Sequence, residues 1–361
     1  MSGLRVLLAA GGTGGHLFPA EALATVLKAR GAEVHLVSDD RAAAYAESFP
    51  APLHQVTSGT VTGKGLLGRF IGALKLAKGT KECLSLIDRL KPDVVVGFGG
   101  YPTVPPLYAA TMRKVPTIIH EQNGVMGRAN RYLASRVTRI ATGFPLRDDA
   151  HAAKASVVGN PVRPPVLAAA AVPFRPLVPG DRFSLLVFGG SQGARVMSDV
   201  VPAALALLSH AERERISLVQ QARGEDLTRV MQAYSDLGMA VDAQPFFKDM
   251  PARIAAAHLV VCRSGASTVA ELSVIGRPSI LVPLPGSLDQ DQAANAAVLA
   301  DAGGAVLQQQ DGFTPDWLAT TLREVMAEPQ RLAAMAAAAR SVAVPDASER
   351  LADLVFATAR R

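Results

Sequence analysis

Residues 5–16 read RVLLAAGGTGGH, an apolar run followed at once by a glycine-rich turn. A short apolar run without polar alternation is typical of a strand that is buried on both faces of a parallel sheet. We therefore expect a strand over Arg5–Ala10, then the turn, then a helix that begins at Pro19. This strand–turn–helix unit predicts an α/β fold.

The same pattern recurs along the rest of the chain. Short runs rich in Val, Ile and Leu alternate with longer segments of helical periodicity, which predicts parallel sheets covered on both faces. The further strands that we expect are 34–38, 94–98, 117–120 and 139–141, and then 184–188, 217–221, 259–262, 279–282 and 305–307. Two such sets predict two doubly wound, Rossmann-like α/β domains.

A proline-rich stretch separates the two sets of strands. It begins with NPVRPP at residues 160–165 and reaches Pro179, a composition typical of an extended linker. Near the other end, Pro345 interrupts a helical pattern and precedes a last helix. We therefore expect an N-terminal domain over 1–160, a C-terminal domain over 161–341 and a terminal helical segment over 342–361.

The composition excludes several classes of protein. Of the 361 residues, 49% are hydrophobic and 19% are charged, which excludes a disordered chain. Cys83 and Cys262 are the only cysteines, so a disulfide scaffold is excluded and the thiols predict no metal site. The first apolar run is too short for a signal peptide, and no run approaches the roughly 20 apolar residues that span a bilayer. We expect a protein that is soluble or rests on a membrane surface.

The charge is unevenly distributed. Residues 1–160 contain 19 Lys and Arg against 11 Asp and Glu, a net charge of +8, whereas residues 161–361 contain 18 against 20, a net charge of −2. A basic half predicts an anionic partner, and the charge alone leaves nucleic acid, lipid and phosphate open. Aromatic residues make up only 5%, which argues against stacking of nucleic-acid bases.

Three glycine-rich turns follow expected strands, and they are Gly11–His16, Gly97–Tyr101 and Gly189–Arg195. Glycine allows a ligand to approach the backbone, and the N–H groups of a following helix attract phosphate or carboxylate. Each glycine could instead serve only a tight turn. Two of the turns, however, follow the first strand of each half, which favours ligand binding. Neither a dinucleotide fingerprint nor a phosphate-binding P-loop is present.

Taken together, the motifs resemble the MurG family of bacterial N-acetylglucosaminyltransferases, within glycosyltransferase family 28. The residues that carry the resemblance span nearly the whole chain: GGTGGH at 11–16 with Phe18-Pro19, GFGGY at 97–101, HEQN at 120–123, GNPVR at 159–163, GGSQGAR at 189–195 and CRSGA at 262–266. The resemblance implies the GT-B fold, in which two doubly wound domains face a cleft.

The resemblance also implies an activity. Members of this family transfer GlcNAc from UDP-GlcNAc, with inversion, to the C4 hydroxyl of the MurNAc unit of undecaprenyl-linked lipid I. The products are lipid II and UDP, and the pathway is peptidoglycan synthesis. By this resemblance the C-terminal domain binds the donor, and the N-terminal domain binds the acceptor at the cytoplasmic face of the inner membrane. The resemblance also implies that the terminal helix, within 342–361, returns to the N-terminal domain.

The same resemblance implies the partners. UDP-GlcNAc is a substrate, no cofactor or metal is expected, and an anionic membrane surface replaces nucleic acid as the partner of the basic half. Other cell-wall synthesis or division proteins are further candidate partners. Two alternatives stay open: another UDP-sugar enzyme of the same fold (a glycolipid glycosyltransferase or a UDP-GlcNAc epimerase), and a catalytically silent membrane scaffold.

Two residues are candidates for the base that deprotonates the acceptor hydroxyl. His16 ends the first glycine-rich turn, and an imidazole suits base chemistry near neutral pH, although a histidine could also only cap the turn. Glu121 follows an apolar strand and is either a rival base or a structural acceptor of hydrogen bonds. By the resemblance, Tyr101 and Asn130 lie on the acceptor side.

The residues expected to bind the donor follow strands of both halves. RSGASTVAE at 263–271 begins a helix, whose N-terminal N–H groups suit a diphosphate. By the resemblance Glu271 binds the ribose hydroxyls, unless it only caps the helix; Phe246 and Phe247 flank the uracil, and Arg163 pairs with phosphate or braces the hinge. The complete expected donor set is Thr13, Gly14, Gly15, Asn123, Arg163, Ser191, Gln192, Phe246, Phe247, Arg263, Ser264, Gly265, Ala266, Ser267, Thr268, Glu271, Gln292 and Asn295.

DQDQ at 289–292, with Asn295, would contact the GlcNAc hydroxyls by the same resemblance. Some family members carry two glutamines where this chain has Asp291-Gln292, so Gln292 is assigned and the role of Asp291 stays open. Asp289 and Asp291 also match the metal-binding DxD pattern of the other glycosyltransferase fold. The remaining motifs favour the metal-independent architecture.

A basic amphipathic segment lies in the +8 half. Residues 64–81 contain five Lys and Arg and no acid, with apolar residues at helical spacing, which is typical of a surface for anionic lipids. The alternative is an ordinary helix whose apolar face joins the core. The predicted membrane surface is Leu67, Phe70, Ile71, Leu74, Lys75 and Lys78.

Overall fold

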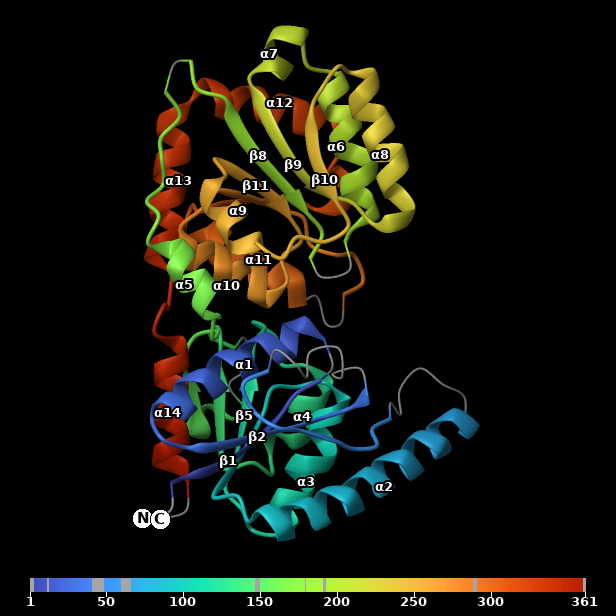
Figure 1. Ribbon diagram of the computed structural model, residues 1–361, viewed down its shortest axis with the longest axis vertical. Helices are drawn as coiled ribbons and strands as arrows, with labels where there is room; N and C mark the ends of the chain where they lie inside the picture. Colours follow the sequence, from blue (N-terminus) through green and yellow to red (C-terminus); the bar gives the residue numbers. More distant parts are fainter. Residues whose placement is uncertain are drawn as a thin grey trace. The chain divides into compact units, whose positions relative to one another are not determined.

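The computed structural model describes residues 3–11, 13–40, 49–59, 66–146, 150–178, 180–190, 193–287 and 291–359 (Figure 1). The chain forms two compact units: unit 1 is Met1–Arg163 with Pro345–Arg361, and unit 2 is Pro164–Val344. These divisions lie three residues beyond the boundaries expected after residues 160 and 341.

Unit 1 is built on a parallel sheet. Among the described residues the strand order is β3-β2-β1-β4-β5-β6-β7, and every neighbouring pair is parallel. The order turns back beside β1, which is the doubly wound arrangement. The strands are β1 (Arg5–Ala9), β2 (Glu33–Ser38), β3 (Leu53–Gln55), β4 (Val94–Gly97), β5 (Thr117–Glu121), β6 (Arg139–Thr142) and β7 (Ala155–Val157).

Helices cover both faces of this sheet (Figure 1). Val6 and Leu8 of β1 pack in one buried cluster with α1 and α14, whereas Leu7 packs in another with α2, α3 and α4. Alternate side chains of one strand thus enter two cores, as a doubly covered sheet requires. The helices are α1 (Gly14–Ala29), α2 (Leu66–Leu90), α3 (Val104–Met112), α4 (Arg128–Ala134) and α14 (Ala347–Thr358), with short 3₁₀ helices η2 (Tyr101–Thr103) and η3 (Ala152–Lys154).

The last helix of the chain belongs to unit 1. Leu351, Ala352 and Val355 of α14 are fully buried in the cluster that contains α1. Arg30 of α1 also pairs with Glu349 and, at 2.6 Å, with Asp353. Unit 1 is therefore made from both ends of the chain, and unit 2 is inserted between them.

Unit 2 repeats the architecture with the parallel order β10-β9-β8-β11-β12-β13 among its described residues. Its strands are β8 (Phe183–Phe188), β9 (Ile216–Gln221), β10 (Val241–Gln244), β11 (Leu259–Cys262), β12 (Ser279–Leu281) and β13 (Ala305–Leu307). Its helices are α5 (Pro164–Ala170), α6 (Arg195–Ala206), α7 (His210–Glu214), α8 (Gly224–Asp236), α9 (Met250–Ala256), α10 (Ala266–Ile275), α11 (Asp291–Asp301), η5 (Gln310–Gly312), α12 (Pro315–Ala327) and α13 (Pro329–Ser341). The prediction of two doubly wound α/β domains is confirmed.

Helix α1 begins at Gly14, not at Pro19 as expected. Pro19 lies in the second turn, where its missing N–H removes a single helix bond. Thr13 is therefore the N-cap residue, and the glycine-rich turn itself supplies the first turn of the helix.

The stretch expected to be an extended linker contains helix α5. Proline is compatible with the first turn of a helix, and the Leu and Ala residues that follow favour the helical state. Val166 and Ala169 are buried, and α5 packs on α9 and α10. The prediction of an extended chain was wrong over Pro164–Ala170.

Strands β3, β7 and β10 were not predicted, and all three lie at sheet edges. Their residues are partly or fully exposed, so none of them forms the continuous apolar run that marks a central strand.

Candidate functional site

The carboxyl ends of β1 and β4 meet where the strand order of unit 1 turns back. The N–H of Gly11 donates to the carbonyl oxygen of Gly99 at 3.2 Å, so the first two glycine-rich turns are joined. Doubly wound sheets bind ligands outside the carboxyl ends of their strands at this switch point. The predicted turns therefore lie where this topology provides a binding site.

His16 lies in the first turn of α1, with its ring against the second glycine-rich turn. A Cβ added to Gly99 would lie 3.5 Å from Nδ1 of His16, and one added to Gly100 would lie 3.4 Å from Nε2. Both glycines have positive φ, +86° and +77°, so a side chain there would be strained as well as crowded. Of the neighbouring predicted residues, Thr13 and Gly15 are exposed, Gly14 is buried, and Tyr101 is partly exposed at the start of η2.

The carboxylate of Glu121 is buried at the end of β5. Its Oε1 accepts hydrogen bonds from the backbone N–H and the side-chain amide of Asn123, both at 3.0 Å. Its Oε2 accepts from the N–H of Gly127 at 2.9 Å and from the amide of Asn130 at 2.8 Å. A general base must reach the proton that it removes, whereas Glu121 is 2% exposed and accepts four bonds. These contacts favour the structural alternative for Glu121, with Asn123 and Asn130 as its donors.

His120 joins the end of β5 to the segment that leaves unit 1. Its Nδ1 accepts from the amide of Gln122 at 3.1 Å, so its Nε2 donates to the carbonyl oxygen of Gly159 at 3.0 Å. The amide of Asn160 in turn donates to the carbonyl oxygen of Gln122 at 2.9 Å. Burial lowers the pKa of His120 to about 4, against a favourable bond to Gly159. The HEQN and GNPVR motifs are therefore held to each other.

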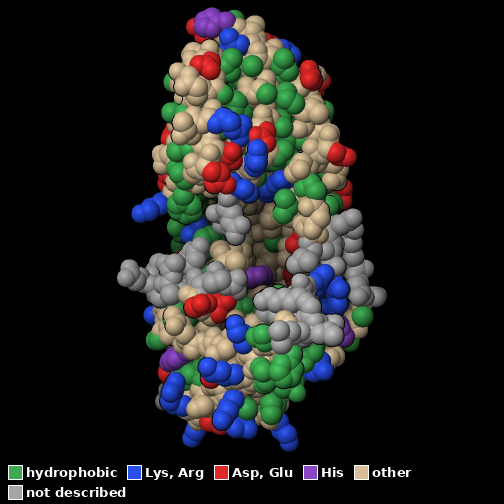
Figure 2. Space-filling model, turned by 90° about the vertical axis from the view of Figure 1, so that its right-hand side faces the viewer, with side chains coloured by type: hydrophobic (Ala, Val, Ile, Leu, Met, Phe, Trp, Pro, Cys, Tyr) green, Lys and Arg blue, Asp and Glu red, His purple; other side chains and the backbone are tan. Residues whose placement is uncertain are grey.

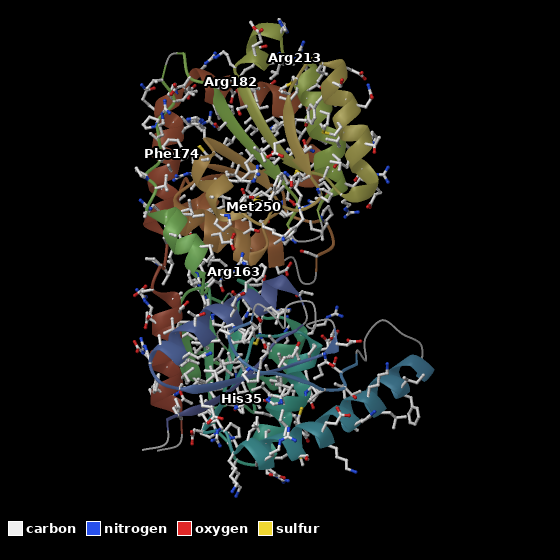
Figure 3. The ribbon with its side chains drawn as sticks, in the orientation of Figure 1. His35, Arg163, Phe174, Arg182, Arg213 and Met250 are labelled. Carbon is white, nitrogen blue, oxygen red and sulfur yellow. The ribbon has the colours of Figure 1, made fainter. Side chains whose placement is uncertain are left out.

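Arg163, the last residue of unit 1 before the insertion, stacks on α1 (Figure 3). Its guanidinium carbon lies 3.8 Å from the ring centroid of Phe18, a cation–π contact. Burial raises the pKa of the nearby Glu21 carboxyl, and the charge of Arg163 partly offsets that rise. The geometry supports the bracing alternative for Arg163 and leaves its contact with phosphate a prediction.

In unit 2 the strand order turns back between β8 and β11. The turn after β8 is held by a hydrogen bond from the N–H of Gly189 to Oε1 of Gln221, at 3.2 Å. Gly193 ends it with a φ of +69°. The predicted donor residues Ser191 and Gln192 lie outside the described residues. The second half of this switch point is the segment after β11, which leads into α10.

The start of α10 gathers several predicted donor residues. Gly265 is the N-cap, and the Oγ of Ser264 donates to the carbonyl oxygen of Gln292 at 2.8 Å. The amide of Asn295 donates to the carbonyl oxygen of Ser264 at 3.2 Å, and Oε1 of Gln292 accepts from the N–H of Leu284 at 3.0 Å. Residues 264, 292 and 295 are thus brought together. The other predicted members on α10 are Ala266, Ser267, Thr268 and Glu271.

Two arginines lie close together beside this switch point. Arg263 is buried and donates to the carbonyl oxygens of Val282 at 3.0 Å and Pro283 at 2.9 Å, and to Oε1 of Gln310 at 2.5 Å. Burial lowers the pKa of Arg263, and the positive charge of Arg223 lowers it further. Most of the N–H donors of Arg263 are therefore used in hydrogen bonds within unit 2.

Arg223 was not predicted. It is the N-cap residue of α8, two residues after β9, and a Cβ on Gly193 would lie 2.8 Å from its Cγ. Its Nη1 lies 3.6 Å from the carboxylate of Glu225. Its Nε is buried without a hydrogen-bond partner among the described residues. Two neighbouring cations with an unused buried donor favour an anion. The signal in the sequence was a basic residue just after a strand, on the neighbour of the strand with the glycine-rich turn.

The two phenylalanines expected to flank the uracil differ in exposure. Phe246 is 58% exposed, whereas Phe247 is 4% exposed and lies under the guanidinium of Arg253, whose central carbon is 4.0 Å from the ring centroid. Phe246 is thus available to a base, whereas Phe247 is part of the core. The expectation that both rings contact uracil is not supported for Phe247.

The possible DxD pair is only half described, because Asp289 lies outside the described residues. Asp291 begins α11, and its Oδ1 accepts from the N–H of Gln292 at 2.7 Å. Within the described part of the chain, His, Cys, Asp and Glu side chains form no group of three that could hold a metal ion.

Comparison with known proteins gives the family. Residues 6–142 match the glycosyltransferase family 28 N-terminal domain, and residues 184–351 match the glycosyltransferase family 28 C-terminal domain. A protein of Methylobacterium nodulans is 58% identical over 360 residues, which cover 98% of this chain and 96% of that protein. One of Mesorhizobium japonicum is 56% identical over 359 residues, which cover 98% and 95%.

Both relatives are named UDP-N-acetylglucosamine–N-acetylmuramyl-(pentapeptide) pyrophosphoryl-undecaprenol N-acetylglucosamine transferase. The crystal structure of Acinetobacter baumannii MurG is 30% identical, covers 98% of this chain and 99% of that one, and superposes with a TM-score of 0.79. The predicted GT-B fold and the resemblance are confirmed: this chain belongs to glycosyltransferase family 28 and is a glycosyltransferase of the MurG type.

Proposed function

We propose that this chain transfers GlcNAc from UDP-GlcNAc to the C4 hydroxyl of the MurNAc unit of lipid I, with inversion, and releases lipid II and UDP. The observation that carries the proposal is 58% identity, over 98% of the chain, to a relative named for this transfer. The position of the glycine-rich turns at both switch points supports it, because each unit then has a binding site for one substrate.

Unit 2 is the proposed donor site. The N-terminus of α10 would receive the diphosphate, Phe246 would stack on the uracil, and Glu271 would accept hydrogen bonds from the ribose. Gln292 and Asn295, which meet Ser264 beside this helix start, would contact GlcNAc. Arg223 and the helix N-terminus would stabilise the departing diphosphate, so the proposal requires neither metal nor cofactor.

Unit 1 is the proposed acceptor site, with His16 as the base. Its imidazole lies against the second glycine-rich turn, near the partly exposed Tyr101. Glu121, by contrast, is assigned to positioning, because its four hydrogen bonds fix the segment from Asn123 to Asn130. This assignment separates the two candidate bases by role.

The beginning of α2 is the proposed membrane surface, at the cytoplasmic face of the inner membrane. Phe70, Ile71 and Leu74 are 63%, 46% and 55% exposed, so they do not join the core, and Lys75 and Lys78 are exposed beside them. Figure 2 shows hydrophobic side chains gathered over this part of unit 1, with Lys and Arg nearby. The side chain of Leu67 lies outside the described residues. No helix in the described part of the chain is both long and apolar enough to cross a membrane.

The test is a reaction of the purified chain with UDP-GlcNAc and a short-chain lipid I analogue. We expect release of UDP and formation of the β-linked disaccharide, unchanged by EDTA. Epimerisation of UDP-GlcNAc without acceptor would instead favour an epimerase. No product, together with no binding of UDP-GlcNAc by calorimetry, would favour the silent scaffold.

A further inference from the structure

Unit 2 contains a pocket at the end of its sheet that is opposite the proposed donor site. The cavity has a volume of about 300 Å³, and its lining combines Arg175, Asp181, Arg182, Ser184 and His258 with the apolar Val172, Pro173 and Ala255–Ala257. Ser184 lies at the start of β8, and His258 directly precedes β11. Since β8 has six residues, the donor turns lie about 20 Å away at the far ends of the strands.

His258 presents a fixed hydrogen-bond donor to this pocket. Its Nδ1 accepts from the backbone N–H of Ser184 at 2.9 Å, and the backbone N–H of His258 donates to the carbonyl oxygen of Ser184 at 2.9 Å. The ring lies between Phe183, stacked at 5.9 Å, and Phe174, edge-on at 6.2 Å. Because Nδ1 is an acceptor, the neutral ring carries its proton on Nε2. His258 is 8% exposed, and within the described chain Nε2 has no hydrogen-bond partner.

The charge around the pocket is positive. Arg182, an exposed residue directly before β8 (Figure 3), uses one nitrogen to donate to the carbonyl oxygen of Ile216 at 3.1 Å and keeps its other donors. Asp181 is paired with Arg175 through bonds of 3.0 and 2.8 Å. Burial lowers the pKa of His258. The negative charge of Asp181 raises this pKa, and the positive charges of Arg175 and Arg277 lower it further. Arg175 and Arg182 against Asp181 leave one net positive charge in the lining of the pocket.

Arg277 also removes the feature that would repel an anion here. The carbonyl end of α9, at Ala255–Ala257, lines the pocket and carries the negative end of the helix dipole. The buried guanidinium of Arg277 donates to the carbonyl oxygen of Ala255 through Nε at 3.0 Å and Nη2 at 2.6 Å. It also donates to Ile275 at 2.8 Å, the last residue of α10. The ends of two helices are thus neutralised by one buried cation.

We propose that this pocket is a second anion site that binds a phosphoryl group, held by the guanidinium of Arg182 and the Nε2–H of His258. The net positive charge of the lining suits an anion, and charge-assisted bonds from arginine suit the oxygens of a phosphoryl group. The cavity exceeds the size of phosphate and has an apolar wall of Val172, Pro173 and alanines, so a small phosphomonoester also fits. The site is independent of the proposed transferase function.

The test is calorimetric titration of the full chain with inorganic phosphate and with glycerol 3-phosphate, at constant ionic strength and with UDP saturating. UDP occupies the proposed donor site, and the part of the remaining phosphate binding that the pocket variants abolish reports on the new pocket. The variants are Arg182→Ala and His258→Asn, since asparagine keeps an acceptor for the Ser184 N–H and removes the Nε2–H. The matched control is Arg215→Ala, which removes an exposed arginine outside the pocket. Thermal melting verifies that each variant is folded.

We expect saturable binding that each pocket variant weakens at least about tenfold and that Arg215→Ala leaves unchanged. Binding of both probes identifies a phosphomonoester site, and binding of inorganic phosphate alone identifies a free-phosphate site. No saturable binding in the presence of UDP would overturn the proposal. So would an equal loss in Arg215→Ala, which would assign the binding to general surface charge. If His258→Asn does not fold, the comparison of phosphate binding by Arg182→Ala with that by Arg215→Ala decides whether the pocket is the site.

Discussion

The imidazole of His120 donates a 3.0 Å hydrogen bond to the carbonyl oxygen of Gly159, across 39 residues of sequence. Both ring nitrogens are used by the neutral form, because Nδ1 accepts from Gln122 at 3.1 Å. A second proton on Nδ1 would face the amide that donates to it. The connection out of unit 1 is therefore held by a histidine that must stay neutral.

Stability should fall in acid because of His120. Its folded pKa is about 4, below the ordinary 6.5, so the unfolded chain binds the proton first as the pH falls. The stabilisation is complete above pH 6.5 and is lost as the pH falls from 6.5 to 4, by about 3 kcal/mol. Urea unfolding from pH 7.5 to 4 should therefore show a steeper loss for the wild type than for His120→Gln. His210→Gln, at an exposed histidine, is the control, and parallel curves for all three proteins would contradict the prediction.

Replacing Glu121 by glutamine should mainly destabilise unit 1. The amide presents a donor where the carboxylate accepts, so two of the four bonds are lost in a buried place. We expect a loss of about 3 kcal/mol in the free energy of unfolding, measured by urea titration. Unchanged stability with a loss of turnover above about a hundredfold would show that Glu121 is the base after all.

Replacing His16 by alanine should slow turnover without weakening the binding of the donor, UDP-GlcNAc. General base catalysis typically contributes about 10²- to 10⁴-fold, so kcat should fall by that range while the Kd of UDP-GlcNAc stays within about threefold. Glu271→Ala provides the contrast, since it should raise that Kd and leave kcat less affected. Unchanged kinetics in both variants would refute the site map.

Arg223→Ala should weaken the binding of phosphates but not of the nucleoside. A charge-assisted hydrogen bond contributes about 1.5–3 kcal/mol, so the Kd of UDP should rise about ten- to a hundredfold while that of uridine stays constant. Calorimetry with the two ligands measures both, and Arg215→Ala is the matched control. An equal loss for UDP and uridine would mean that Arg223 only supports the fold.

A triple change of Phe70, Ile71 and Leu74 to serine should release the protein from membranes. Complete burial of such a side chain contributes about 1.5–3 kcal/mol, so the partitioning of the protein onto vesicles should fall at least about tenfold. Co-sedimentation with vesicles of anionic phospholipid measures it, with neutral vesicles as reference. Met231→Ser removes another exposed apolar side chain, from unit 2, and should have no effect. Loss of binding in Met231→Ser would contradict a specific surface.

Much of the architecture could be predicted from the sequence, because central strands of a parallel sheet are recognisable as short apolar runs. The ten expected strands were found, since most of them are apolar runs inside their sheet, although β13 (Ala305–Leu307) lies at an edge. Other edge strands, such as Val241–Gln244, were not predicted, because alternate side chains along them are exposed and no continuous apolar run results. The start of α1 was misplaced because proline was given more weight than the glycines that begin the helix.

The site was harder to predict, because residue type does not reveal which groups a side chain hydrogen-bonds to in the folded protein. Glu121 and Arg263 have the chemistry of a base and of a phosphate contact, yet much of their capacity is used within their own units. Arg223 was missed since its neighbour Gly193 is distant in sequence and meets it only through the parallel pairing of β8 and β9. Exposure likewise distinguishes Phe246 from Phe247, which are indistinguishable by residue type.

The return of α14 has a consequence for biosynthesis. Residues 3–163 of unit 1 leave the ribosome before unit 2, but residues that complete the core beside α1, such as Leu351 and Val355, are translated only after unit 2. Until they emerge, the apolar face of α1 lacks its covering helix throughout the synthesis of all of unit 2. The unit whose synthesis begins first is thus completed after the other, and a ribosome that stops at residue 344 leaves unit 1 without α14 and incompletely protected from the cell's proteases.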